Sequence, residues 1–220
     1  AVFLLLRAGG VGARPVRQAV ASARRDRDWG IRDRTGFWLL AGIVFLDITV
    51  QGGFLTFIAF LMIEKEVPAN LAAVAVVLTL AGGIFGKFGC GLLADRIGVV
   101  RALWIVQLLT AAGILAIAFA PTLLAYCLLP MLGVVLQGSS SITYATVGDL
   151  VHKDRQSRGF AAIYSLSSAA GIVGPIIFGL LGDGYGLVPA MITMAVVVLL
   201  TLPLGSRLGS AITAVSRTPD

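Results

Sequence analysis

The sequence predicts an all-α polytopic membrane protein whose six transmembrane helices form a three-plus-three inverted repeat. Hydrophobic residues make up 58% of the chain and charged residues 13%, whereas an ordinary soluble domain has roughly 25% charged residues. Six apolar runs follow one another, and each is long enough to cross a bilayer core of about 30 Å. Two octets, 91–98 and 179–186, share Gly, Leu, Leu, Asp and Gly in register, and each closes the second run in a group of three.

The leading segment differs in composition from the rest of the chain. Residues 1–6 are apolar and are cut off by Arg7, so we interpret them as the end of a preceding helix. A signal peptide would carry its charges before the apolar core, which is the reverse order. Residues 7–35 carry eight arginines without a sustained apolar period. This composition predicts a basic cytoplasmic loop, part of it an amphipathic helix on the membrane surface.

Short polar breaks separate the spans of a transmembrane domain that we place at 36–205. The breaks are the segment 64–70, the first octet, the turn at 120–122, the polar loop 152–158 and the second octet. We expect the spans at 37–63, 71–94, 101–120, 123–147, 160–181 and 187–204. Residues 206–220 are then a short tail.

The distribution of Lys and Arg predicts the orientation, because positively charged loops stay on the cytoplasmic side. Taking alternate breaks, every Lys and Arg except Lys65 falls on one side of the membrane. Both ends of the chain are therefore expected in the cytoplasm. The first octet then faces the cytoplasm and the second faces outward, where Gly184 stands in the place of Arg96. Such inverted repeats are typical of secondary transporters.

The first octet resembles the signature loop of the major facilitator superfamily, between the second and third helices of a six-helix unit. The matching residues are Gly91, Leu93, Ala94, Asp95, Arg96, Gly98 and, near the basic end, Arg101. The sequence departs from the pattern at Val99 and Val100, where the family usually has Arg or Lys. The resemblance covers about residues 37–205. It implies the C-terminal six-helix half of a transporter that works by alternating access, with 7–35 as the central loop after an N-terminal half.

The resemblance also suggests a role for the loop residues Gly91, Asp95, Arg96, Gly98 and Arg101. The charge of Asp95 at a helix C-terminus is unfavourable unless a cation or another helix N-terminus lies close. A contact that forms in one arrangement and breaks in the other would bias alternating access. The alternative interpretation is a tight charged turn that only fixes topology.

Asp47 and Lys87 are ionisable residues inside predicted spans, and such residues are expensive in a bilayer and therefore functional candidates. Both are expected roughly 12 to 16 Å from the cytoplasmic boundary, at about 1.5 Å per residue, so they could meet across adjacent helices. Lys87 stands four residues before Gly91, where monocarboxylate transporters and related organic-anion carriers usually have an arginine that binds the substrate carboxylate. Lysine would keep the charge and lose bidentate recognition. Alternatively, Lys87 snorkels to the headgroups.

Polar residues near the middle of spans form a second group of candidates for the substrate site. Helical spacing relates its members within each span: Gln51 to Asp47, then Gln137, Ser141 and Tyr144, and finally Tyr164 and Ser168. Interhelical hydrogen bonding in the bundle is the alternative role.

Glycine-rich stripes occur in the second and fifth spans. In the fifth, we expect Gly171 and Gly174 to serve close helix packing and Pro175 to kink the helix.

Together these features predict a carrier for a small solute, an organic anion or monocarboxylate coupled to protons. A drug or multidrug efflux carrier of the same superfamily is the alternative, and a membrane receptor or subunit without transport is a remote one. We expect no enzymatic activity, because buried histidines and clustered acids are lacking, and no cofactor, metal or nucleic-acid partner. The expected surroundings are the lipid bilayer of a bacterial-type plasma membrane.

Overall fold

The computed structural model describes residues 30–216, and the helices are α3 (Arg34–Glu64), α4 (Ala69–Ile97), α5 (Val99–Phe119), α6 (Thr122–Leu150), the short 3₁₀ helix η1 (Lys153–Arg155), α7 (Gln156–Tyr185), α8 (Leu187–Leu199) and α9 (Thr201–Ser216). Within this range, six helical segments are long and apolar enough to cross a membrane, with α8 and α9 together forming the sixth. The predicted all-α fold with six membrane-spanning helices is confirmed. The predicted helix end at 1–6, residues 7–29 of the predicted loop 7–35, and residues 217–220 of the predicted tail lie outside the described range.

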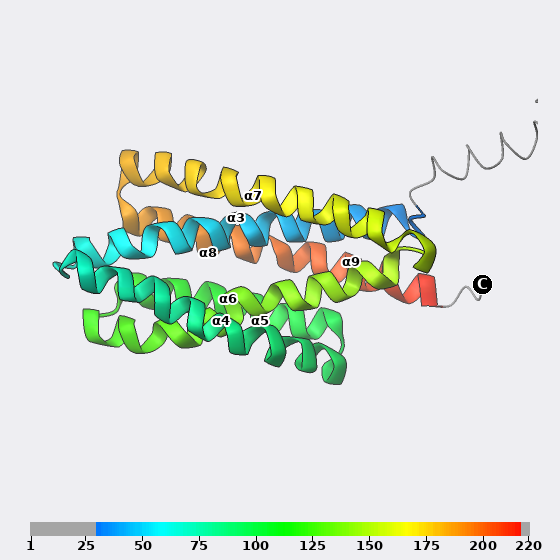
Figure 1. Cartoon of the computed structure of the whole chain (residues 1–220), viewed down its shortest axis with the longest axis horizontal. Helices are drawn as coiled ribbons and strands as arrows, with labels where there is room; N and C mark the ends of the chain where they lie inside the picture. Colours follow the sequence, from blue (N-terminus) through cyan, green and yellow to red (C-terminus); the bar gives the residue numbers. More distant parts are fainter. Residues whose placement is uncertain (1–29, 217–220) are drawn as a thin grey trace, which may run out of the picture.

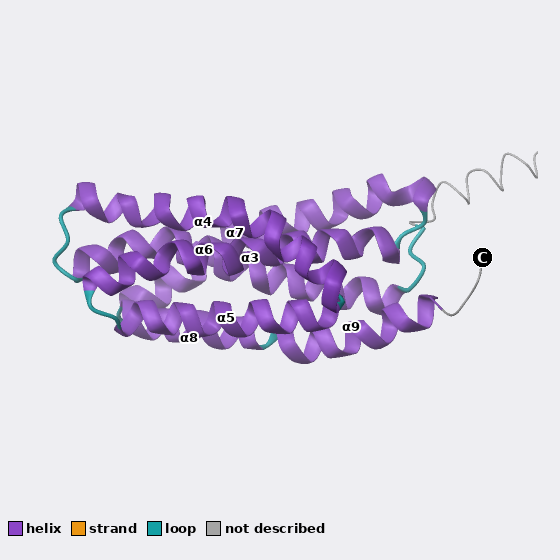
Figure 2. Ribbon diagram, turned by 90° about the horizontal axis from the view of Figure 1, so that it is seen from below, coloured by secondary structure: helices purple, strands orange, loops and turns teal. Residues whose placement is uncertain are grey.

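The helices form an elongated bundle in three layers (Figures 1 and 2). α4 and α7 lie on one side, α3 and α6 lie between, and α5 with α8 and α9 lies on the other side. α4 packs most extensively against α6, and α7 packs most extensively against α3. The second helix of each group of three therefore lies against the first helix of the other group. This exchange relates the two halves of the internal repeat.

Glycines make the two exchanged contacts possible, since the backbones approach each other there without intervening side chains. A Cβ atom at Gly82 or Gly86 of α4 would overlap the carbonyl group of Pro130 or Val134 in α6. In the other pair, a Cβ at Gly174 of α7 would overlap the carbonyl of Thr49 in α3. Small residues at such contacts are a general device of membrane helices.

The other two candidates of the fifth span also lie at the contact between α7 and α3. A Cβ atom built on Gly52 would lie 3.2 Å from the carbonyl oxygen of Gly171 and 3.6 Å from Cδ of Pro175. α7 continues past Pro175 to Tyr185.

Both octets are helical almost to their ends, where the sequence suggested turns. α4 continues through Asp95 and Arg96, and the reversal into α5 takes place at Gly98 alone, with φ 88°. In the second octet Gly186 has φ 92° and joins α7 to α8 in the same way. Each of these glycines donates its N–H to the carbonyl four residues earlier. Asp and Arg do not break a helix, whereas a positive φ favours glycine.

The sixth span is interrupted at Leu200, and its second part extends beyond the predicted end at 204. Pro203 explains the interruption, because it has no N–H to donate to the carbonyl of Leu199 and its ring would clash there. In the first turn of α9 the missing N–H costs nothing, so the helix restarts at Thr201 and continues to Ser216.

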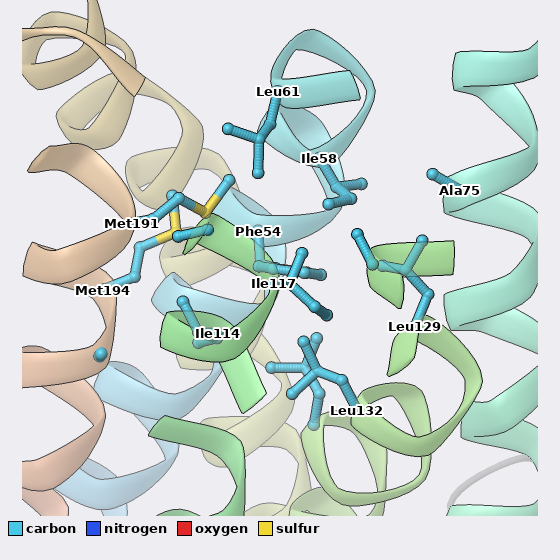
Figure 3. Packing of buried hydrophobic residues seen from close by; sticks show 14 of the residues in the cluster. Phe54, Ile58, Leu61, Ala75, Ile114, Ile117, Leu129, Leu132, Met191 and Met194 are labelled. Atoms are coloured by element: carbon cyan, nitrogen blue, oxygen red, sulfur yellow. The ribbon is translucent and has the colours of Figure 1, made fainter. Parts of the chain in front are cut away.

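The largest part of the core lies toward the end of the bundle where α3 meets α4 (Figure 3). Phe54 and Ile58 of α3 meet Ile114 and Ile117 of α5, with methionines of α8 beside them. At this end Lys65 donates hydrogen bonds from its ammonium group to the carbonyls of Ala118 and Ala120. The Lys65 side chain therefore covers the C-terminus of α5.

Two backbone hydrogen bonds tie the opposite end together. Arg32 donates its N–H to the carbonyl of Leu150 over 2.9 Å, and His152 donates to the carbonyl of Gly30, also over 2.9 Å. The segment that leads into α3 is thus joined to the connection between α6 and η1.

Candidate functional site

A buried polar group lies where α3, α5 and α6 meet. Asp47 of α3 is only 2% exposed, and it is surrounded by apolar residues of its own helix because this part of α3 faces the bundle interior. Its Oδ1 accepts a hydrogen bond from Nε2 of Gln107 in α5 over 2.9 Å. Its Oδ2 lies 2.6 Å from Oγ of Ser139 in α6. We call Asp47, Gln107 and Ser139 the carboxylate node.

Gln107 and Ser139 are both fully buried. Oε1 of Gln107 has no hydrogen-bond partner among the described residues. Ser139 Oγ also lies 3.1 Å from the carbonyl oxygen of Leu136. Buried polar atoms are normally satisfied, so an orphaned amide oxygen next to a buried carboxyl group is an unusual arrangement.

Gln51 lies one turn beyond Asp47 in α3 and extends the polar group toward the same stretch of α6. It is half-buried, and its Nε2 donates to the carbonyl oxygen of Leu136 over 3.0 Å. Gln51 and Ser139 therefore converge on one backbone carbonyl. This convergence links two candidates of α3, Asp47 and Gln51, to a single turn of α6.

Lys87 of α4 is exposed and is not brought to Asp47. The preceding residue, Gly86, packs against Val134 of α6. Because successive residues of a helix point about 100° apart, Lys87 is directed away from that contact. Among the described residues, Lys87 has neither a hydrogen bond nor an ion pair. Asp47 and Lys87, which could meet if both side chains faced the interface between their helices, are not paired, and Asp47 is hydrogen-bonded to Gln107 instead.

The aromatic candidates Tyr144 of α6 and Tyr164 of α7 lie side by side. The rings of Tyr144 and Tyr164 lie 4.9 Å apart between centroids, and Phe160 continues the row at 6.4 Å from Tyr164. The Tyr144 hydroxyl is 3.3 Å from Oγ of Ser167. Tyr164 is 53% exposed, so the row opens at the surface of the six-helix unit.

The remaining polar candidates lie along the surfaces of α6 and α7. Ser168 is exposed and donates to the carbonyl of Tyr164 over 2.9 Å. Gln137 is half-buried against Gly83 of α4, where a Cβ would come within 2.6 Å of its Cδ. Its Nε2 has no partner among the described residues. Ser141, also half-buried, lies near Gly91, farther along the same contact between α4 and α6.

The charged residues of the first octet are accessible. Asp95 and Arg96 end α4 and are exposed, as is Arg101 in the first turn of α5. The hydrogen bonds and ion pairs of the described residues include none of these three side chains. Gly98 between the two helices is likewise open, since a Cβ there would meet nothing within 4 Å.

Sequence reasoning missed Gln107 and Ser139. Both stand in the middle of predicted spans, and Ser139 lies between the candidates Gln137 and Ser141. A search for every mid-span amide and hydroxyl would have found them. Their pairing with Asp47 depends on how each helix is rotated about its axis, which hydropathy does not define.

Comparison with known proteins gives a family match and similar curated proteins. The model of the Major Facilitator Superfamily matches residues 37–215. An uncharacterized MFS-type transporter, YfnC of Bacillus subtilis, is 33% identical over 145 residues, covering 66% of this chain and 34% of the relative. Autophagy-related protein 22-2 of Aspergillus clavatus is 29% identical over 151 residues, covering 60% of this chain and 24% of the relative. The chain thus spans about a third or less of these curated relatives.

Proposed function

The chain belongs to the major facilitator superfamily and is an integral membrane protein, and on this basis we propose that it forms part of a secondary active transporter. The observation that carries the proposal is the family match across all six membrane-spanning segments. The transporter would move a small solute by alternating access.

We propose that the six-helix unit is the C-terminal half of the carrier and that its partner is an N-terminal six-helix half. Two observations support this arrangement. The chain covers only 34% and 24% of its two relatives. In addition, Lys87 of α4 and Tyr164 and Ser168 of α7 are exposed on the unit at positions within membrane spans. Polar side chains at that depth normally face a bundle interior or a water-filled cavity rather than lipid.

In this arrangement Lys87, Tyr144, Tyr164 and Ser168 line the substrate cavity, together with Gln137 and Ser141. The substrate is an organic anion of the monocarboxylate type, because Lys87 supplies a cation that is unpaired among the described residues and stands in an apolar stretch of α4. Asp47, with Gln51 one turn away, serves proton coupling by symport. A carboxyl group can gain and lose one proton, and Asp47 is isolated from bulk water.

Two further assignments belong to the same proposal. Gly91, Asp95, Arg96, Gly98 and Arg101 form a gate whose exposed charges contact another part of the carrier in one of its two arrangements. The membrane is a bacterial-type plasma membrane with both ends of the chain on the cytoplasmic side, where the basic residues gather.

A drug efflux carrier is the second candidate function. The row of Phe160, Tyr164 and Tyr144 favours it, because stacked and partly exposed rings suit flat aromatic or cationic compounds. Uptake assays on one preparation separate the two candidates.

The full-length carrier reconstituted in vesicles is tested with labelled monocarboxylates under an imposed pH gradient, with and without a protonophore. We expect accumulation that the protonophore abolishes and that falls at least tenfold in Lys87→Gln. Lys153→Gln, at an exposed lysine of η1, is the matched control and should transport like the parent. Unchanged monocarboxylate uptake in Lys87→Gln, or transport of aromatic cations alone, would refute the anion assignment.

A further inference from the structure

The carboxylate node holds a carboxyl group whose only hydrogen-bond partners among the described residues are uncharged. Asp47 contacts the amide of Gln107 and the hydroxyl of Ser139. A buried carboxylate normally requires a cation or several donors, because removing the charge from water is costly. The structure supplies two neutral groups instead. Each of them, however, is able to act both as donor and as acceptor.

No titratable group on the helices packed around Asp47 replaces the missing cation. Away from the helix ends these groups are Lys87 and Cys90 of α4, Tyr126, Cys127 and Tyr144 of α6, Tyr164 of α7 and Arg207 of α9, and α8 has none. Lys87, Cys127, Tyr164 and Arg207 are exposed. Cys90 points to the carbonyl of Val134, Tyr126 donates to the carbonyl of Leu71, and Tyr144 is hydrogen-bonded to Ser167. Arg101, in the first turn of α5, is exposed as well. None of them is paired with Asp47.

Ser139 has one hydroxyl hydrogen and two acceptors within reach. Its Oγ lies 2.6 Å from Oδ2 of Asp47 and 3.1 Å from the carbonyl oxygen of Leu136. With Asp47 ionised, the hydroxyl donates to Oδ2. With a proton on Oδ2, Asp47 donates to Oγ, and the serine turns its hydrogen to Leu136. Rotation of the Ser139 hydroxyl about its Cβ–Oγ bond therefore accommodates both the ionised and the protonated form of Asp47 without moving a heavy atom.

Gln107 offers the same choice from the other side of the carboxyl group. Its Nε2 donates to Oδ1 over 2.9 Å, while its buried Oε1 is without a partner among the described residues. No second contact of Oε1 fixes the amide, so a half turn would present Oε1 to Asp47 as an acceptor. The unpaired Oε1 of Gln107 is thus the atom that would accept a hydrogen bond from protonated Asp47 after this half turn.

We propose that Ser139 and Gln107 are positioning residues that allow Asp47 to bind and release a proton inside the bundle. This inference rests on the proposed coupling role of Asp47 and deepens it. The proton comes from the aqueous phase, forms the O–H bond at Asp47 and returns to water on release. α5 therefore takes part in the coupling site, although it lies in the layer with α8 and α9 rather than between the two outer layers (Figure 2).

Infrared difference spectroscopy of the full-length protein in lipid vesicles tests this inference without any transported solute. A protonated carboxylic acid has a carbonyl band that a carboxylate lacks. Other Asp and Glu residues also gain this band in acid, so the signal of Asp47 is the band that the parent has and Asp47→Asn lacks. We expect this difference band at low pH and its loss as pH rises. Ser139→Ala and Gln107→Leu each remove one donor from the ionised form, so the midpoint should rise by roughly one to two pH units.

Ser140→Ala is the matched control, because Ser140 is the next residue, is also buried, and donates to the carbonyl of Gln137. Its midpoint should equal that of the parent. Because Ser139 and Gln107 come from different helices, the shift remains measurable if one variant fails to fold. The inference is overturned if the parent and Asp47→Asn give the same band at every pH, if neither Ser139→Ala nor Gln107→Leu shifts the midpoint, or if sodium ions displace the proton at constant pH. A titrating Asp47 in a protein whose uptake ignores the pH gradient would instead refute the coupling role alone.

Discussion

The side-chain amide of Gln107 in α5 donates a hydrogen bond to the carboxyl group of Asp47 in α3 over 2.9 Å. This contact joins an inner helix to an outer one, and Ser139 extends it to α6. Three helices therefore meet at a single ionisable group. A change in the charge of that group acts on all three helices at once, as the proposed proton coupling requires.

Replacing Asp47 with Asn should separate transport coupling from folding. The amide keeps an oxygen and a polar group of nearly the same shape for Ser139 and Gln107, and it removes a buried ionisable group. We expect the thermal unfolding midpoint of purified Asp47→Asn to match or exceed that of the parent, while solute accumulation no longer responds to a pH gradient. A variant that still accumulates solute in proportion to the gradient would contradict this prediction.

Gly86→Ala should destabilise the contact between α4 and α6. The added methyl group would overlap the carbonyl of Val134, and overpacking typically costs about 1–3 kcal/mol. Gly89→Ala is the matched control on the same helix, since nothing lies within 4 Å of a Cβ there. The control should be neutral or up to about 1 kcal/mol more stable, because alanine favours helix over glycine. Equal unfolding midpoints for the two variants would show that the contact tolerates the methyl group.

Gly98→Ala should strain the reversal between α4 and α5. At φ 88° an alanine is unfavourable by about 1–3 kcal/mol, although the surroundings of Gly98 are open. Gly186→Ala, with φ 92°, should behave in the same way because it holds the equivalent place in the second group of three. Gly184→Ala lies within helix α7 in open space and should not lower stability. Thermal unfolding of the three variants side by side tests whether the backbone or the neighbouring side chains set the requirement.

Lys65→Met should loosen the end of α5. The ammonium group is hydrogen-bonded to the carbonyls of Ala118 and Ala120, and a cation is favoured at a helix C-terminus. Methionine keeps the apolar stem, so the expected loss of about 1 kcal/mol reports on the charged head. Lys153→Met, at an exposed lysine of η1, should leave the unfolding midpoint unchanged. A drop of similar size in both variants would mean that net charge, rather than this contact, is responsible.

The helices and their repeat could be predicted because length and hydropathy are properties of each segment alone. Gly98 and Gly186 mark the reversals at equivalent positions of the two octets. The side-chain partners could not be predicted, since they depend on the rotation of each helix about its axis. Asp47 is a candidate from sequence because a charged residue within a predicted span is easily recognised. Gln107 is recognised as its partner only in the structure, where α5 is rotated so that Gln107 faces α3. Lys87 shows the same limit, because the contact at Gly86 directs it away from Asp47.

The exchanged pairing of helices has a consequence for how the protein is made. α4 packs most extensively against α6, and α7 packs most extensively against α3. During synthesis α3, α4 and α5 are made before α6, so Gly82 and Gly86 of α4 lack their partner helix until α6 is inserted. Neither group of three can reach its final packing by itself. The two groups of three helices must therefore assemble together. A nascent chain halted after α5 should remain a substrate for membrane quality control.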